Sequence, residues 1–189
     1  MDLTETSLSS EPVFDGALLH VRRDTVRLPD GETSQREWIE HPGAAAVVPV
    51  DDRGRVVLVR QFRFAPRREF WEVPAGKLDP TGETPLELAQ RELAEEVGLA
   101  ADRWTPLGTT YPAIGYSDEA IHLFLAEGLT DAQRESDDDE FVEPFRVPLA
   151  EAVAMARRGE IEDAKSCVAL LLAHAALGAR APSPGPSSP

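Results

Sequence analysis

The segment Gly76–Leu99 constrains the fold most, because it predicts one helix with marked ends and two different faces. Thr84 is the expected N-cap, Pro85 suits the first helical position, and Glu87 completes a capping box. Gly98 is the expected C-terminal stop. Apolar residues recur at helical spacing, namely Leu86, Ala89, Leu93 and Val97. The helix must therefore bury this apolar stripe against another layer of the fold.

A separate face of the same helix is acidic. Glu92 lies three residues before Glu95 and four before Glu96, so the three carboxylates neighbour one another. Like charges at this spacing destabilise a helix, and the macrodipole disfavours anions in the last turn by roughly 0.3–1 kcal/mol each. A hard divalent cation would remove that penalty, because Mg²⁺ takes carboxylate oxygens and often also binds substrate phosphates.

The rest of the chain reads mainly as β-structure, with two further helices at Leu149–Arg158 and Asp163–Leu177. The expected strands are Ala17–Val21, Asp24–Leu28, Glu37–Glu40, Ala44–Val50, Arg55–Arg60, Phe70–Val73, Trp104–Thr110, Ile121–Ala126 and Glu143–Pro148. Strands with a few separated helices predict an α+β fold layered as an α/β sandwich, not a βαβ repeat.

Charge and composition exclude several classes of protein. A net charge of −15 argues against a general binder of nucleic acid, which would need basic patches. No run of about 18 apolar residues is present, so neither a transmembrane helix nor a membrane partner is expected. The single Cys167 excludes an internal disulfide and suits a reducing compartment. The N-terminus lacks a signal pattern, and we expect a cytoplasmic protein.

The helix and the turn before it resemble the signature of the Nudix hydrolases. That pattern is Gly, five residues, Glu, seven residues, then Arg-Glu-Leu-x-Glu-Glu-x-Gly-Leu. The matching positions are Gly76, Glu83, Arg91, Glu92, Leu93, Glu95, Glu96, Gly98 and Leu99. One departure exists, because six residues separate Gly76 from Glu83 instead of five. The extra residue lies in the turn and leaves the helix register unchanged.

Several looser segments resemble the ADP-ribose pyrophosphatase branch of that family. They are REWIEHPGAAAVVPV, VRQFR, WEVPAG, YPAIGYSDE and GEIEDAKSCVALLL. The resemblance implies a Nudix-type α/β/α sandwich with a mixed β-sheet and an N-terminal β-strand extension. It also implies Mg²⁺-dependent hydrolysis, with Mn²⁺ as an alternative, of the diphosphate of ADP-ribose to AMP and ribose 5-phosphate.

Composition and the same resemblance together imply a division of the chain, with the two tails read from composition. Residues 1–12 would be a flexible tail, and residues 13–42 a β-extension used for dimerisation. Residues 43–178 would form the Nudix hydrolase domain, and residues 179–189 a disordered Pro/Ser tail. Family members of this kind are homodimers with exchanged N-terminal strands, so we expect a homodimer.

The resemblance assigns the metal to the backbone carbonyl of Ala75 and the carboxylates of Glu92, Glu95 and Glu96. Arg91 would organise the site by pairing with an acid such as Glu83, and it is grouped with Glu95 among the catalytic residues. For the general base, the resemblance aligns Glu140 with the glutamate that activates water. Asp139 and Glu143 are alternatives, and the acidic run at residues 135–140 could also simply be solvated.

Substrate contacts are expected from four residues. Arg63 and Arg36 could bind the diphosphate, because a guanidinium suits bidentate phosphate contacts, or could be surface residues. Glu72 could hydrogen-bond adenine or ribose, or brace its loop. Trp38 could stack on adenine, or pack in a core or an interface.

Three other functions compete with this interpretation. The nearest is a hydrolase of another nucleoside diphosphate sugar, because the pocket side chains cannot be placed from the sequence. A catalytically silent Nudix-like binding or regulatory module would be expected to lose acids of the signature, and none is missing. A messenger RNA decapping enzyme is disfavoured by the acidic charge and the lack of a basic aromatic groove.

Overall fold

The computed structural model describes residues 1–79, 82–133 and 142–180. Its residues fall into two compact units. One unit comprises Met1–Gly43 with Tyr111–Ala120, and the other comprises Ala44–Thr110 with the chain from Ile121 onward. Among the described helices, none combines the length and the apolar character needed to cross a bilayer.

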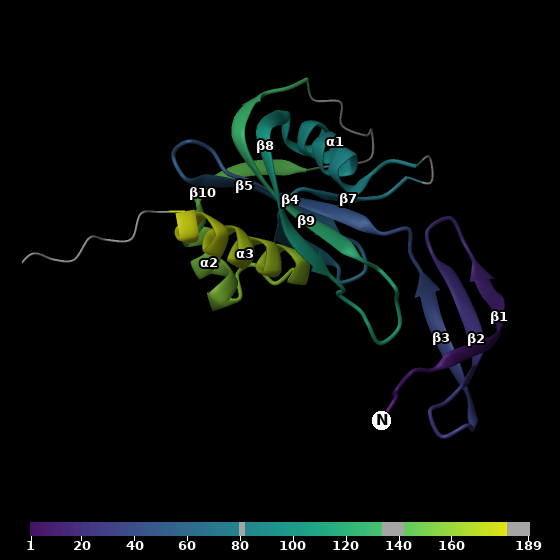
Figure 1. The fold of residues 1–189 in the computed structure, drawn as a ribbon. Coiled ribbons are helices and arrows are strands. Elements are labelled where there is room, and N and C mark those ends of the chain that lie inside the picture. Colours follow the sequence, from purple (N-terminus) through teal and green to yellow (C-terminus); the bar gives the residue numbers. More distant parts are fainter. Residues whose placement is uncertain (80–81, 134–141, 181–189) are drawn as a thin grey trace, which may run out of the picture. The chain divides into compact units, whose positions relative to one another are not determined.

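The N-terminal unit is a three-stranded antiparallel sheet, purple to blue in Figure 1, in the order β1-β2-β3. Its strands are β1 (Thr6–Asp15), β2 (His20–Arg27) and β3 (Thr33–Glu40). Val26 is the one buried residue of these strands. Three strands with so little burial form a sheet without a core of its own.

Strand β1 corrects the flexible tail that the sequence predicts over residues 1–12, because the strand begins at Thr6. Polar contacts across the sheet hold it in place. Ser7 and Ser10 donate hydrogen bonds from Oγ to the Asp24 carboxylate, at 2.9 and 2.5 Å. The segment is exposed and polar, so it lacks the alternating apolar pattern from which strands are predicted.

The second part of this unit, Tyr111–Ala120, continues from the edge of β3. The amide of Ile39 donates to the carbonyl of Tyr116 at 2.8 Å, and Ile39 pairs in parallel with Ser117. The amide of His41 donates to Asp118 Oδ1 at 2.8 Å. The segment containing the YPAIGYSDE motif is therefore anchored to the strand that carries Arg36 and Trp38.

The larger unit has a mixed four-stranded sheet in the order β7-β4-β9-β8, and a three-stranded antiparallel sheet in the order β10-β5-β6. The four-stranded sheet contains β4 (Ala44–Pro49), β7 (Ala75–Lys77), β8 (Leu99–Thr110) and β9 (Ile121–Asp131). The other contains β5 (Arg55–Arg63), β6 (Arg68–Glu72) and β10 (Glu143–Pro148). Strand β4 pairs in parallel with β9 and antiparallel with β7.

Helices cover this unit in two groups, as Figure 1 shows: α1 (Pro85–Val97) on one side, and α2 (Leu149–Arg158) with α3 (Ala164–Arg180) on the other. Every residue of β4 is buried. Ala45 and Val47 pack in a cluster with α1, whereas Ala46 and Val48 pack in a cluster with α2 and α3. Because alternate residues of a strand point to opposite faces, β4 forms the middle layer. The predicted α+β fold with an α/β/α sandwich is confirmed.

Helix α1 has both of the ends that the sequence predicts. The Glu87 amide donates to Thr84 Oγ1 at 3.3 Å, and the Thr84 amide donates to Glu87 Oε2 at 2.8 Å. Gly98 ends the helix in the left-handed conformation with φ of 67°. These caps satisfy backbone groups that a helix leaves unpaired, so they fix where the acidic face begins and ends.

Candidate active site

Arg91 is the centre of a cluster of carboxylates on and beside α1. Its Nη1 lies 2.7 Å from Glu95 Oε2 and 3.0 Å from Glu92 Oε1. Its Nε lies 3.0 Å from Glu83 Oε1, which is the pairing expected for this residue. The hydrogen bonds to Glu83 and Glu95, with the charges of Glu92 and Glu95, raise the pKa of Arg91. One guanidinium therefore offsets three acids that would otherwise repel one another.

The acidic face lies against the turn that enters β7. Glu92 and Glu96 are buried, with 8% and 2% of their surface exposed. Glu96 Oε2 accepts a hydrogen bond from the Ala75 amide at 3.2 Å. A Cβ on Gly76 would lie only 1.9 Å from Glu92 Oε1, so the glycine makes room for that carboxylate. The fold thus brings Ala75 together with Glu92 and Glu96, which were expected as metal ligands.

These residues fit a hard divalent cation. Each side-chain donor is a carboxylate oxygen, which Mg²⁺ prefers, and the lack of a Cβ at Gly76 lets the Glu92 carboxylate lie against the backbone of β7. In the described part of the chain, no cluster of three or more His, Cys, Asp and Glu side chains is already arranged around a common point. Glu92 and Glu95 are instead drawn together by Arg91.

A second charged group lies where β5 and β6 meet the start of α3. Arg63 donates from Nε and Nη2 to the two carboxylate oxygens of Glu72, both at 2.7 Å. Lys165 Nζ also donates to Glu72 Oε2. Glu72 is 2% exposed, whereas the side chain of Arg63 is 46% exposed. Of the two roles expected for Glu72, the geometry matches bracing, because both of its oxygens are already engaged by side chains.

The electrostatics link this group to α1. The hydrogen bonds to Glu72 raise the pKa of Arg63, and the charges of Glu96 and Asp163 add to that effect. Burial by itself would raise the pKa of Glu72, but the hydrogen bonds from Arg63 and the charge of Lys165 outweigh it and lower that pKa. Glu72 is therefore a buried carboxylate held in its charged form, beside a half-exposed arginine that feels the charge of Glu96.

Three polar residues of this group, Asp163, Lys165 and Ser166, were not expected from the sequence. Ser166 is fully buried, and its Oγ donates to Asp163 Oδ2 and accepts from the Val73 amide at 2.9 Å. The sequence does mark this place, because three of the four residues Asp163-Ala-Lys-Ser166 are polar and they stand at the start of a strongly apolar helix. A buried serine at the start of such a helix needs a hydrogen-bond partner, and that requirement could have singled it out.

The remaining expected site residues have other contacts. Arg36 pairs with Glu5 through Nε at 2.9 Å and Nη2 at 2.6 Å, and Trp38 Nε1 donates to Asp24 Oδ1 at 3.2 Å. Both contacts are internal to the N-terminal unit. Glu140 and its alternative Asp139 lie outside the described residues. The third candidate base, Glu143, accepts from Arg60 Nη2 at 2.7 Å.

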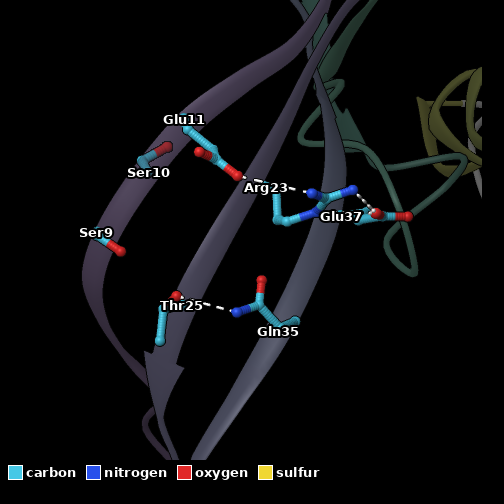
Figure 2. A pocket seen from close by; sticks show the side chains of 7 residues that line it. All are labelled: Ser9, Ser10, Glu11, Arg23, Thr25, Gln35 and Glu37. Carbon is cyan, nitrogen blue, oxygen red and sulfur yellow. Dashed lines mark hydrogen bonds and ion pairs between the residues drawn. The ribbon is translucent and has the colours of Figure 1, made fainter.

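The N-terminal unit also has a polar groove, shown in Figure 2. Its lining residues are Ser9, Ser10, Glu11, Arg23, Thr25, Gln35 and Glu37. Arg23 lies between two acids, 2.9 Å from Glu37 Oε1 and 3.6 Å from Glu11 Oε1. The groove therefore holds two acids against one cation, and this net negative charge makes it a poor receptor for a diphosphate.

Family models match both parts of the chain. A model described as NUDIX domain matches residues 39–170, which include α1 and the group around Glu72. A model described as nucleoside diphosphate sugar hydrolase N-terminal domain matches residues 5–39, which include β1 and β2.

Similar proteins cover most of the chain. The ADP-ribose pyrophosphatase of Bacillus subtilis is 41% identical over 170 residues, which cover 89% of this chain and 91% of that protein. The ADP-ribose pyrophosphatase of Mycobacterium tuberculosis is 42% identical over 171 residues, covering 89% and 83%. A solved structure described as "Crystal structure of ADP compounds hydrolase" has a TM-score of 0.84 at 26% identity, covering 96% of this chain and 98% of the other.

Proposed function

The chain belongs to the NUDIX family, and from that premise we propose that it hydrolyses the diphosphate of ADP-ribose to AMP and ribose 5-phosphate. In this reaction the oxygen of water bonds to one phosphorus, and the bond from that phosphorus to the bridging oxygen breaks. The other phosphate leaves with the bridging oxygen and stays attached to its sugar, so the products are AMP and ribose 5-phosphate. The observation that carries the proposal is the half-exposed Arg63, fixed by Glu72 and close enough to feel the charge of Glu96. This arrangement offers a cation for a diphosphate beside a face suited to a metal.

We assign the metal, Mg²⁺ or alternatively Mn²⁺, to the Ala75 carbonyl and to Glu92, Glu95 and Glu96. When bound, the metal would polarise phosphoryl oxygens and lower the pKa of a bound water. Arg91 serves this site by holding Glu92 and Glu95 at fixed positions, which its contacts at 3.0 and 2.7 Å support.

We assign the general base to Glu140, which would accept the proton of the attacking water. Asp139 and Glu143 are the alternatives. The ion pair between Glu143 and Arg60 favours Glu140 over Glu143, because the Glu143 carboxylate is already engaged by a guanidinium. For the substrate, we assign Arg63 to the diphosphate, with Glu72 as its support.

We further propose a homodimer with exchanged N-terminal strands, in which Arg36 and Trp38 contact the substrate in the partner's site. The sheet of the N-terminal unit supports this proposal, because Val26 is the one buried residue of its three strands. The unit also exposes large apolar side chains, among them Val13, Phe14 and Leu19. These side chains are available for contact with a partner chain. The lone free Cys167 is consistent with a cytoplasmic protein.

A second candidate is a hydrolase of another nucleoside diphosphate sugar. The match of residues 5–39 to a nucleoside diphosphate sugar hydrolase N-terminal domain favours it, because that description names no particular base or sugar. A catalytically silent module is disfavoured because Glu92, Glu95 and Glu96 are all present.

The test is a turnover screen of the purified protein with Mg²⁺ against ADP-ribose, other sugar nucleotides, NADH and nucleoside triphosphates. We expect the highest kcat/KM with ADP-ribose. Preference for a different nucleotide sugar would favour the second candidate, and no turnover of any compound would refute hydrolysis. Monomeric behaviour in solution would refute the exchanged dimer.

Glu96→Gln tests the metal assignment within the same screen. It removes one charge from a buried carboxylate at nearly constant shape, and we expect turnover to fall at least about 100-fold while the fold persists. The matched control is Glu151→Gln on the exposed face of α2, which should retain full activity. Near-normal turnover of Glu96→Gln would overturn the assignment.

A further inference from the structure

The first turn of α3 reaches across to the end of β6 through three polar side chains. Lys165 Nζ donates both to Glu72 Oε2 and to Asp163 Oδ2, the latter at 2.9 Å. Ser166 Oγ donates to the same Asp163 oxygen and accepts from the Val73 amide. These bonds form one continuous chain from the Val73 backbone to the carboxylate that holds Arg63.

This chain of bonds is well shielded from water. The side chain of Lys165 is 13% exposed, that of Glu72 is 3% exposed, and Ser166 is fully buried. Arg63 alone would already balance the charge of Glu72, and Lys165 balances the second acid, Asp163, while it also binds Glu72. Buried ion pairs are also weak contributors to stability, because desolvation offsets most of their attraction. The arrangement therefore calls for a reason other than stability.

The backbone held by this chain leads directly into the proposed metal site. The Val73 amide is bound by Ser166, the Pro74 carbonyl accepts from the Val47 amide at 2.9 Å, and the Ala75 amide is bound by Glu96. Three consecutive residues are thus each fixed by a different element. The first turn of α3 therefore fixes Val73, two residues before Ala75, and through Lys165 it also binds the carboxylate of Glu72 that holds Arg63.

We propose that Lys165 is a positioning residue for substrate binding: with Asp163 and Ser166 it fixes Glu72, and Glu72 in turn orients Arg63 toward the diphosphate. This proposal rests on the proposed function, because it needs an anionic substrate at Arg63. Lys165 itself contacts neither the substrate nor the reacting atoms. Lys165 holds the Glu72 carboxylate in place, and this carboxylate in turn keeps the Arg63 guanidinium from rotating.

The test compares Lys165→Met with Lys165→Arg in the full chain, using whichever nucleoside diphosphate sugar the wild type hydrolyses fastest. Because a displacement of about 1 Å can cost about 100-fold, we expect Lys165→Met to raise KM by about 10- to 100-fold, with a smaller change in kcat. Lys165→Arg restores a cation and should return KM to within about fivefold of the wild type. Because the substrate is chosen by its measured turnover, the result does not depend on ADP-ribose being the preferred substrate.

A binding measurement avoids any dependence on turnover. Titration calorimetry of the same nucleotide sugar with a chelator present should show the same weakening for Lys165→Met. The control is Arg158→Met, which changes the net charge equally but breaks an exposed ion pair on α2, and it should bind as the wild type does. A folded Lys165→Met with KM and affinity within twofold of the wild type would overturn the proposal.

Lys165→Met leaves Glu72 with one cation and could fail to fold. The double variant Glu72→Gln with Lys165→Met then removes the buried charge and its partner together. If Lys165 is a positioning residue, this double variant should fold but keep a raised KM, because Arg63 has lost the carboxylate that holds it. Because Lys165 acts only through Glu72, this KM should equal that of Glu72→Gln alone; a KM that differs from that single variant, or that equals the wild-type value, would refute the proposal.

Discussion

Gly76→Ala tests the metal site by adding a single methyl group. The new Cβ would lie 1.9 Å from Oε1, 2.2 Å from Cδ and 2.9 Å from Cγ of Glu92. Gly76 does not adopt the left-handed φ found at other glycines such as Gly98. The backbone therefore accepts alanine without strain, and the whole effect of the substitution falls on the Glu92 side chain.

The size of the effect follows from the distances. Real Cβ atoms essentially never approach another heavy atom within 3.0 Å, so the Glu92 carboxylate must retreat by about 1.1 Å. A displacement of that size at a reacting site costs about 100-fold in rate. Overpacking of a close contact destabilises a fold by about 1–3 kcal/mol. We therefore expect a protein that still folds but has lost most of its turnover.

The assay measures metal affinity, turnover and stability on the same preparation. Mn²⁺ binding followed by electron paramagnetic resonance should weaken at least about tenfold, which corresponds to about 1.4 kcal/mol. The control is Gly178→Ala in α3, where a Cβ meets no heavy atom within 4 Å. That variant should bind metal normally and should gain up to about 1 kcal/mol of stability from its better helix propensity.

Two results with Gly76→Ala would contradict a role of Glu92 as a metal ligand held in place beside Gly76. If Gly76→Ala binds Mn²⁺ and turns over substrate as the wild type does, Glu92 is free to move without consequence and is not a ligand. If instead metal binding is unchanged while stability falls by the expected amount, the close approach of Gly76 to Glu92 serves packing alone.

Three further predictions concern Arg91, the helix cap and pH. Arg91→Met removes the cation shared by three acids, so in a chelator the variant should have a lower Tm than the wild type. Addition of Mg²⁺ should then raise the Tm of the variant more than that of the wild type. An equal rise in Tm for both proteins would contradict this expectation. Thr84→Ala removes the N-cap oxygen and should lower the free energy of unfolding by about 1 kcal/mol in urea without changing kcat. The lowered pKa of Glu72 means that its stabilising effect is complete above its pKa in the unfolded chain and is lost as pH falls through its pKa in the folded chain. Because Lys165 contributes to that lowering, the stability gap between the wild type and Lys165→Met should be widest near neutral pH and should narrow below about pH 4, as measured by urea unfolding.

Helix α1 could be predicted because all of its signals are local. The cap residues Thr84, Glu87 and Gly98 act within one turn of the helix ends, and the structure has them in those roles. The periodicity of the sequence correctly placed Ala89 and Leu93 in the core, but it was wrong for Leu86, which is exposed, while Leu88 is buried instead. The spacing of the acids on the acidic face follows from the same periodicity, which is why Glu92 and Glu96 could be placed on one face from the sequence alone.

Strand β1 could not be predicted, because its support comes from another strand. Its residues are all exposed, and its pairing depends on contacts such as Ser7 and Ser10 with Asp24, at sequence separations of 17 and 14 residues. Such a segment has the composition of a flexible tail. Sequence patterns report burial, and a strand that is paired but not buried leaves no such pattern.

The group around Glu72 escaped prediction for a related reason, since 93 residues separate Lys165 from Glu72. Burial nevertheless offers a signal that spacing does not. Five polar or charged residues are buried in the described part of the chain, namely Gln61, Glu72, Glu92, Glu96 and Ser166. Four of them belong to the acidic face or to the group around Glu72. Because a buried polar group is costly unless it is bonded, a fold keeps such groups mainly where they are needed, and their concentration here is an argument for function that is independent of the signature.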